Sequence, residues 1–300
     1  MKILIIAIIV GVGITIGSFT LFYPESKDFE IQNNEKIEYD ETITIGIIHR
    51  DSEKMFKRYQ PLADYLAREL SDDTVIYKGI AKILPSEQQM IQSVNNGEID
   101  IFFDSPLIGM KIASNTDLEP FLLSWKEGHR NYHSVFITSI DSDISFENLH
   151  GKTMIFEDRE STSGYFLPAI HLQKAGYDFD WESSKDFSYV FSLDDENTPI
   201  WILEGKGDVG ATSNLDFEDI PLNIKEKLKI IESTESVPRQ IIFVDNSFEF
   251  QIKLKEILLK MNETPETQEI LKKISKINQF SEIDIEKDLK IINELMELIH

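Results

Sequence analysis

The chain has 300 residues, of which 41% are hydrophobic and 28% are charged, an ordinary composition for a globular α/β protein with room for two modest lobes. Its formal net charge of −23 argues against nucleic acid or anionic lipid as a partner, because the long-range field of the protein repels polyanions. The absence of cysteine excludes disulfides, thiolate metal sites and a lipid anchor on cysteine.

The first 23 residues resemble a membrane segment. Residues 3–23 carry no charge, Lys2 precedes them, and acidic residues follow. A bilayer span needs about 20 residues, whereas the core of a signal peptide has roughly 7–15, and no small-x-small cleavage site stands out. We therefore expect residues 1–23 to be an uncleaved anchor, with a cleaved signal segment as the alternative; either places the rest outside the cytoplasm. Residues 24–41 are polar and acidic, which predicts a linker.

From residue 42 onwards, apolar runs alternate with amphipathic stretches. The pattern predicts strands over 42–49, 74–78 and 99–103, with helices over 55–70, 87–94 and from Ser105-Pro106 onwards. Proline at the start of the last helix is favourable, because its missing N–H is not needed in a first turn. Such alternation predicts a parallel-rich sheet covered by helices on both faces.

A second run of the same kind follows. It predicts strands over 133–139, 153–156, 187–191, 208–212, 228–232 and 240–244, helices over 164–174, 199–203, 248–261 and 267–277, and an amphipathic helix over 283–300 that caps a lobe. The chain returns to its first part after the second run. We therefore predict a monomer of two α/β lobes joined by two crossovers, with lobe 1 formed by 42–131 plus 235–300 and lobe 2 by 132–234.

A hydroxyl-rich turn, Ser161-Thr162-Ser163-Gly164, stands between the strand ending at Phe156 and the helix that follows. Its side chains and the unpaired N–H groups of a helix start are donors, and the helix dipole adds positive potential. The turn therefore predicts a site for a small tetrahedral oxyanion that needs no lysine or arginine. The alternative is that Ser161 is only an N-cap, which one hydroxyl satisfies.

Four motifs in this order carry a resemblance to a known family: Tyr132-His133-Ser134, the run Leu-His-Gly-Lys over 149–152, the Ser-Thr-Ser-Gly-Tyr turn, and Val237-Pro238-Arg239. Over residues 42–273 the chain resembles the substrate-binding proteins of phosphonate, phosphite and phosphate ABC transporters. The resemblance implies a type II periplasmic-binding-protein fold, a small phosphorus oxyanion bound between the lobes, an ABC permease as partner and no cofactor.

Further candidate ligand contacts follow from strand ends and from the resemblance. Phe103-Asp104-Ser105 ends a strand, where family members usually place an aromatic residue and a small turn, although Phe103 lacks the phenol hydroxyl often found there. Asp104 is otherwise a helix cap. His49 follows the first strand, and the resemblance places His133 at the first crossover within reach of an anion. His129 and His133 are four apart, but their segment does not have a helical pattern, so we expect no metal pair.

The segment 191–197 departs from the family pattern. Related proteins commonly have a Gly-Ser-His-Asp-like turn here, and Asp195 stands at the histidine position. A carboxylate beside a phosphate dianion costs roughly 1–4 kcal/mol at ~4 Å in a partly wet site. Either Asp194, Asp195 and Glu196 point to solvent, or they receive a cationic group of the ligand, which would favour an aminoalkylphosphonate.

No catalytic motif accompanies these residues: the sequence lacks a Gly-x-Ser-x-Gly elbow, a Gly-x-x-x-x-Gly-Lys-Ser/Thr loop and a His-Glu-x-x-His pair. We therefore predict an extracytoplasmic solute-binding protein for ABC-type import rather than an enzyme. The alternative is the ligand-binding input module of a signalling system, which would need a separate partner chain.

Overall fold

The computed structural model describes residues 38–297, except Glu182 and Ser275. The predicted anchor and nearly all of the predicted linker lie outside the described residues. Within the described part, no helix is long and apolar enough to cross a membrane.

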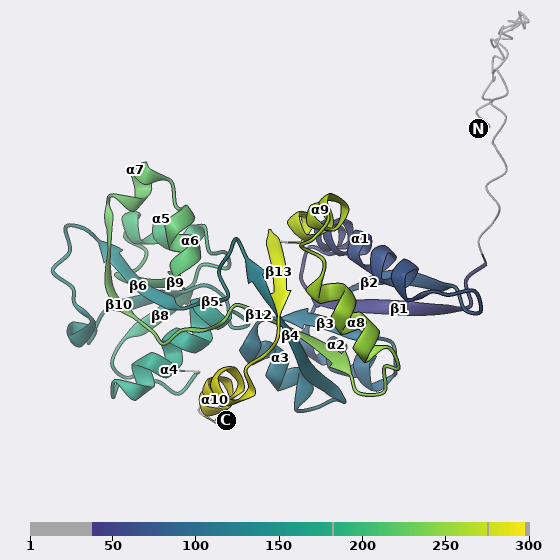
Figure 1. Ribbon diagram of the computed structural model, residues 1–300. Coiled ribbons are helices and arrows are strands. Elements are labelled where there is room, and N and C mark those ends of the chain that lie inside the picture. Colours follow the sequence, from purple (N-terminus) through teal and green to yellow (C-terminus); the bar gives the residue numbers. More distant parts are fainter. Residues whose placement is uncertain (1–37, 182, 275, 298–300) are drawn as a thin grey trace, which may run out of the picture. The chain divides into compact units, whose positions relative to one another are not determined.

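The first lobe is built on a six-stranded sheet with the order β13-β4-β12-β3-β1-β2 (Figure 1). Its strands are β1 (Glu41–Ile48), β2 (Tyr77–Leu84), β3 (Ile101–Asp104), β4 (Leu118–Lys126), β12 (Gln240–Asp245) and β13 (Ile277–Ser281). Its helices are α1 (Ser52–Leu70), α2 (Glu87–Asn95), α3 (Pro106–Ala113), α8 (Gln251–Leu259) and α9 (Pro265–Lys273). β1 pairs in parallel with β2 and β3, whereas β12, β4 and β13 are antiparallel additions.

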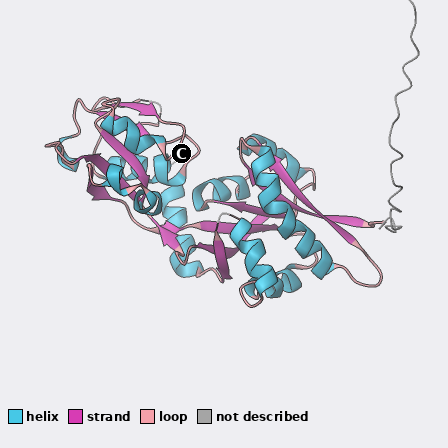
Figure 2. Cartoon of the chain, turned by 90° about the horizontal axis from the view of Figure 1, so that it is seen from above, coloured by secondary structure: helices cyan, strands magenta, loops and turns pink. Residues whose placement is uncertain are grey.

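The second lobe is built on a five-stranded sheet with the order β10-β6-β9-β7-β8. Its strands are β6 (Ser134–Ser139), β7 (Thr153–Phe156), β8 (Ser188–Phe191), β9 (Val209–Ser213) and β10 (Leu228–Ser233). A π-helical turn (Thr162–Phe166) leads into α4 (Leu167–Lys174), and α5 (Asn197–Leu203), α6 (Asn214–Asp219) and α7 (Leu222–Lys225) follow. Helices accompany the strands in each lobe (Figure 2). β7 is parallel to β8 and β9, whereas β6 and β10 run antiparallel to their neighbours.

The chain passes between the two sheets twice, through β5 (Asn131–Tyr132) and β11 (Val237–Pro238), which pair with each other antiparallel. The Arg239 N–H extends this pairing by donating to the Arg130 carbonyl at 2.8 Å. One apolar core cluster runs through these crossovers and contains buried residues of both sheets. The chain therefore forms two α/β lobes joined by two crossovers, and the lobe limits given above stay predictions.

The strand directions and several element limits differ from the prediction. Each sheet is only partly parallel, because the strands on either side of a crossover enter antiparallel. The sequence analysis missed β4, which contains Pro120; the β4 pairing with β12 has a register shift beside Pro120, and a bulge tolerates a residue without an N–H. It also missed β13, because the predicted helix over 267–277 ends at Lys273.

The C-terminal segment contacts both lobes. It begins with a π-helical turn (Ile285–Leu289) and continues as α10 (Lys290–Met296), which packs beside α3 (Figure 1). Buried Asp288 pairs with Arg130 through two hydrogen bonds, one from Nη1 of 2.8 Å. Leu295 shares a small cavity with Leu167 and Ile170 of the second lobe. The segment was predicted to cap a lobe, and the pair of Asp288 with Arg130 also attaches it to the first crossover.

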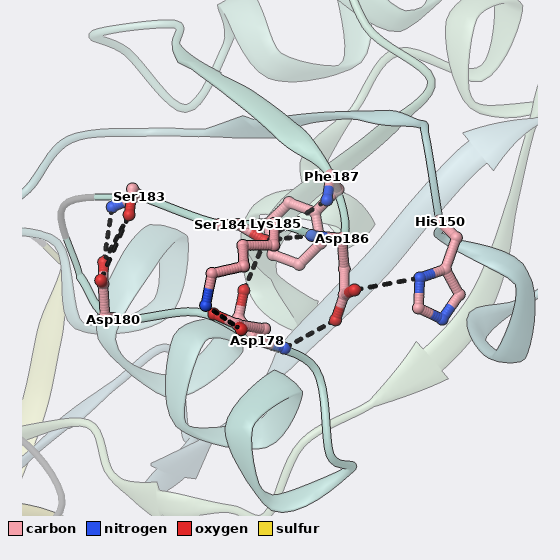
Figure 3. Close-up of polar contacts among 8 residues, drawn as sticks. All are labelled: His150, Asp178, Asp180, Ser183, Ser184, Lys185, Asp186 and Phe187. Atoms are coloured by element: carbon pink, nitrogen blue, oxygen red, sulfur yellow. Dashed lines mark hydrogen bonds and ion pairs between the residues drawn. The ribbon is translucent and has the colours of Figure 1, made fainter.

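The connection from α4 to β8 is held by polar contacts (Figure 3). The Asp186 carboxylate accepts from the Asp178 N–H at 2.7 Å and lies 3.2 Å from His150 Nδ1, while Lys185 pairs with Asp178 at 2.8 Å. These bonds fix the loop before the edge strand β8.

Candidate ligand-binding site

A cavity of about 600 Å³ lies where strand ends of both lobes meet. Its wall is polar, and its residues are Ile48, His49, Arg50, Lys54, Pro85, Asp104, Ser105, Lys126, Tyr132, Glu157, Asp158, Glu160, Ser161, Thr162, Ser163, Leu193, Asp194, Asp195, Asp216 and Arg239. Several of these residues follow the carboxyl ends of β1, β3, β7 and β8. In sheets with parallel strands, this edge is where ligands bind.

The hydroxyl turn forms the start of the helix that faces the cavity. Ser161 Oγ accepts from the Gly164 N–H at 2.8 Å and donates to Glu157 Oε2 at 2.6 Å, so it is an N-cap whose hydrogen is already used. The N–H groups of Thr162 and Ser163 have no acceptor among the described residues, as expected for a first helical turn. Those two N–H groups are therefore the open donors of the turn.

A hydrogen-bonded chain connects this turn to the other lobe. Thr162 Oγ1 donates to Ser105 Oγ at 2.9 Å, and Ser105 donates to Asp104 through its N–H at 2.6 Å and its hydroxyl at 3.1 Å. Burial, opposed by the Ser105 bonds, raises the pKa of Asp104 to about 7. A second contact between the lobes is the ion pair of Arg50 with Asp158, at 2.7 Å.

Of the four cationic side chains on the wall, only Arg50 forms an ion pair among the described residues. Lys54, Lys126 and Arg239 form none, and Lys126 and Arg239 lie close enough to affect each other. The Arg239 guanidinium lies 4.6 Å from the centre of the Tyr132 ring, and its Nε is buried without a hydrogen-bond partner in that part of the chain. Burial first, and then the Arg239 charge, lowers the pKa of Lys126. An anion placed beside these two side chains would reduce the repulsion between their charges.

The sequence analysis missed these cations. It concluded that the hydroxyl turn needs no lysine or arginine, and it quoted Arg239 only as part of a motif. The signal that could have found Arg239 is its position directly after the Val-Pro crossover, since a crossover between lobes passes beside the cavity.

The second lobe contributes acidic side chains to the wall. Glu157, Asp195 and Asp216 have no cationic ion-pair partner among the described residues. Burial raises the pKa of Glu157 to about 7, and burial together with the charge of Asp216 raises the pKa of Asp195 to about 6.

His49 lines the cavity as a neutral donor. Its Nδ1 accepts from the Asp51 N–H at 2.8 Å, which leaves the ring hydrogen on Nε2. Burial first, and then the charge of Lys54, lowers the pKa of His49.

Of the residues predicted as ligand contacts, seven lie on the wall: His49, Asp104, Ser105, Ser161, Thr162, Ser163 and Asp195. Phe103, His133 and Gly164 do not. Phe103 is buried and packs edge-on against Tyr59 and Phe280, because successive strand residues face opposite sides and Asp104 takes the cavity side.

The same alternation explains His133, which follows the wall residue Tyr132. Its Nδ1 lies 3.5 Å from Ser236 Oγ, outside the cavity. Gly164 lies behind Glu157, and a Cβ at this position would collide with that side chain. Gly164 therefore contributes by having no side chain, which lets the turn lie close to Glu157.

A protein of two α/β lobes with a polar cavity where they meet is a periplasmic-type solute-binding protein. Residues 45–289 match the family model of the periplasmic substrate-binding proteins of phosphonate ABC transporters, and the chain belongs to this family. Proteins of the family bind substrate for a permease, so the chain is not an enzyme, and its family is extracytoplasmic.

Solved structures share the fold. The XAC2383 protein of Xanthomonas citri, bound to chloride, matches with a TM-score of 0.79 and 23% identity over 86% of this chain and 98% of that one. The same protein bound to ATP matches with a TM-score of 0.77 and 23% identity over 86% and 98% of the two chains. PhnD1 of Prochlorococcus marinus in complex with methylphosphonate gives 0.66 and 17% identity over 86% and 98%. These matches confirm the predicted type II fold.

Proposed function

We propose that the chain captures a phosphonate that carries a protonated amine and delivers it to an ABC permease. The observation that carries this proposal is the polarity of the cavity. Lys126 and Arg239 lie on its wall without ion pairs, beside the open N–H groups of the helix start. Asp195 and Asp216 lie on the same wall without a cationic partner among the described residues. A zwitterion satisfies both groups at once.

Charge decides between the candidate ligands. Hydrogen bonds to a charged group contribute about 1.5–3 kcal/mol each, so Arg239, Lys126 and two N–H groups suffice for a phosphonate. A ligand without an amine leaves the carboxylates of Asp195 and Asp216 unpaired beside an anion. That repulsion costs roughly 1–4 kcal/mol at ~4 Å.

The nucleotide in one Xanthomonas citri structure is a poor model for the ligand of this chain. The cavity wall contains seven aspartate and glutamate residues against four lysine and arginine residues. A triphosphate would bring several negative charges to this wall, whereas an aminoalkylphosphonate brings a cation with its anion.

Titration calorimetry against phosphate, phosphite, methylphosphonate, 2-aminoethylphosphonate and ATP tests the proposal. We expect 2-aminoethylphosphonate to bind most tightly, by about tenfold or more over methylphosphonate, because it alone gains a charge-assisted bond to the carboxylates. Tightest binding of ATP or phosphate would refute it.

The proposal includes an extracytoplasmic, membrane-held monomer. It is supported by the uncharged run over residues 3–23 and by the family to which the chain belongs. Deleting residues 2–23 should release the protein from the membrane fraction in its own cell. Growth on 2-aminoethylphosphonate as the only phosphorus source should require the full chain, whereas a purely sensory role would leave growth intact when the permease is expressed independently.

A further inference from the structure

A second cavity of about 400 Å³ adjoins the ligand cavity. Asp195 and Asp216 line both, so these two carboxylates stand at the junction. The rest of the wall contains five apolar residues from α5 and from the segment after α6, together with Thr212 and two further acidic residues. The apolar residues are Pro199, Ile200, Ile220, Pro221 and Ile224, and the acidic ones are Glu196 and Asp219. We call this second cavity the side groove.

Thr212 faces the side groove with an unused hydroxyl. Its side chain lies on β9 with only 3% exposed, and its hydroxyl has no hydrogen-bond partner among the described residues. The direction follows from strand alternation: a Cβ on Gly210 would lie 2.6 Å from Thr198 and 2.9 Å from Ile202 of α5, and Thr212 shares that face. The hydroxyl oxygen is open to the groove, where it can form a hydrogen bond with a polar ligand atom.

We infer that the side groove receives a substituent on the amine of the ligand, so that the preferred ligands are N-substituted aminoalkylphosphonates. The inference rests on the proposed function and adds the substrate class. An ammonium held between Asp195 and Asp216 lies at the mouth of the groove, and a substituent on nitrogen extends into it. Methylenes contact the prolines and isoleucines, and a hydroxyl on the substituent reaches Thr212.

The two carboxylates that the groove shares with the ligand cavity favour a ligand over a protein partner. Ile200 is 38% exposed and Leu222 is 81% exposed, so apolar side chains also lie around the groove on the outer surface. A protein segment docking there would bury Leu222, which does not line the groove, and would not need the carboxylates at the junction.

Calorimetry with 2-aminoethylphosphonate and its N-methyl, N-ethyl, N-propyl and N-(2-hydroxyethyl) derivatives tests the inference. Each methylene that enters the groove should strengthen binding by about three- to fourfold, the equivalent of burying one CH₂ group. The variant Ile200→Trp narrows the groove and should remove the gain for N-propyl while leaving the parent compound within about twofold. Leu203→Trp is the matched control, because Leu203 lies on the same helix, is 37% exposed and does not line the groove.

Thr212→Val keeps the shape of the side chain and removes its hydroxyl. It should weaken only the N-(2-hydroxyethyl) compound, by about tenfold, and it provides a second test if Ile200→Trp does not fold. If the parent binds but every N-substituent weakens binding, the groove takes no ligand and the inference fails alone. If none of the compounds binds, including the parent, the proposed function fails and the inference with it.

Discussion

Arg130 and Arg239 are joined by a backbone hydrogen bond, but their guanidinium groups lie in different environments. Arg239 lies in the ligand cavity without an ion pair among the described residues. Arg130 forms a two-fold hydrogen-bonded pair with Asp288, of which only 2% is exposed. Replacing each by methionine keeps most of the apolar stem of the side chain and removes the charged group.

Arg239→Met should weaken binding of methylphosphonate by about ten- to a hundredfold, because at least one hydrogen bond worth about 1.5–3 kcal/mol is lost. Its stability without ligand should be unchanged or higher, since a buried Nε without a partner disappears and Lys126 loses a like charge. Arg130→Met should behave in the opposite way. It leaves the Asp288 carboxylate buried and unpaired, so the free energy of unfolding should fall by nearly the roughly 3–5 kcal/mol that breaking a buried ion pair costs. The affinity for the ligand should stay within about twofold.

Calorimetry for affinity and urea unfolding without ligand measure the two effects. If Arg239→Met lowered stability and left the dissociation constant unchanged, Arg239 would be a structural residue and the phosphonate would lie elsewhere. If Arg130→Met weakened binding as much as Arg239→Met, the charge of the crossover as a whole would act on the ligand, and the distinction between the two arginines would be wrong.

Three further predictions concern the remaining parts of the site and the tether. Thr162→Ala removes the hydroxyl that is bound to Ser105 but keeps the open N–H groups, so phosphonate binding should not weaken. Ser161→Ala should weaken binding by about tenfold and lower stability by about 1 kcal/mol, because it removes the N-cap that holds those N–H groups in place. Unchanged binding in the double variant would move the site away from this turn. Asp195→Asn should weaken 2-aminoethylphosphonate about tenfold and spare methylphosphonate. With a native pKa of about 6 against an ordinary 3.8, Asp195 ionises as pH rises through 6, so this selectivity should grow over that range. As pH rises from 3.8 to about 6, the unliganded protein should lose stability, because the native state binds the Asp195 proton more tightly than the unfolded state does. A selectivity that does not change with pH would refute the role assigned to Asp195. A chain starting near Glu35 should be a soluble monomer that binds ligand fully, as judged by size-exclusion chromatography and calorimetry, and aggregation would show that the preceding residues belong to the fold.

The fold could be predicted from local patterns wherever these patterns agree with the tertiary structure. The β1 strand and the α2 helix follow from hydrophobic periodicity and capping, because their own residues provide the buried faces. Strand β4 could not be predicted in this way, since Pro120 contradicts a strand and only its partner β12 shows how a bulge accommodates it. Whether a strand runs parallel or antiparallel likewise depends on the strand that it pairs with, and its own sequence does not show this.

Residues of the cavity wall could be predicted where one segment carries them, as in the hydroxyl turn, although the donors left open there are backbone N–H groups rather than the expected hydroxyls. The site was not predictable where segments far apart in the sequence meet. The sequence around Lys126 and around Arg239 indicates only exposed cations, and the pairing of β12 with β4 is what brings the two side chains to the same wall. Phe103 was assigned to the cavity from its place at a strand end, but the side of the strand that a residue faces depends on the exact end of the strand.

Two polar contacts that join the lobes beside the cavity have a kinetic consequence. The bond from Thr162 to Ser105 and the exposed ion pair from Arg50 to Asp158 together favour the joined arrangement by on the order of 1–2 kcal/mol. Where entry requires the lobes to separate, both contacts must break first, and at that energy only about a tenth of the molecules are open at any moment. Removing these contacts should therefore raise the association rate constant, and a cell scavenging dilute phosphonate would experience them as a limit on the speed of capture.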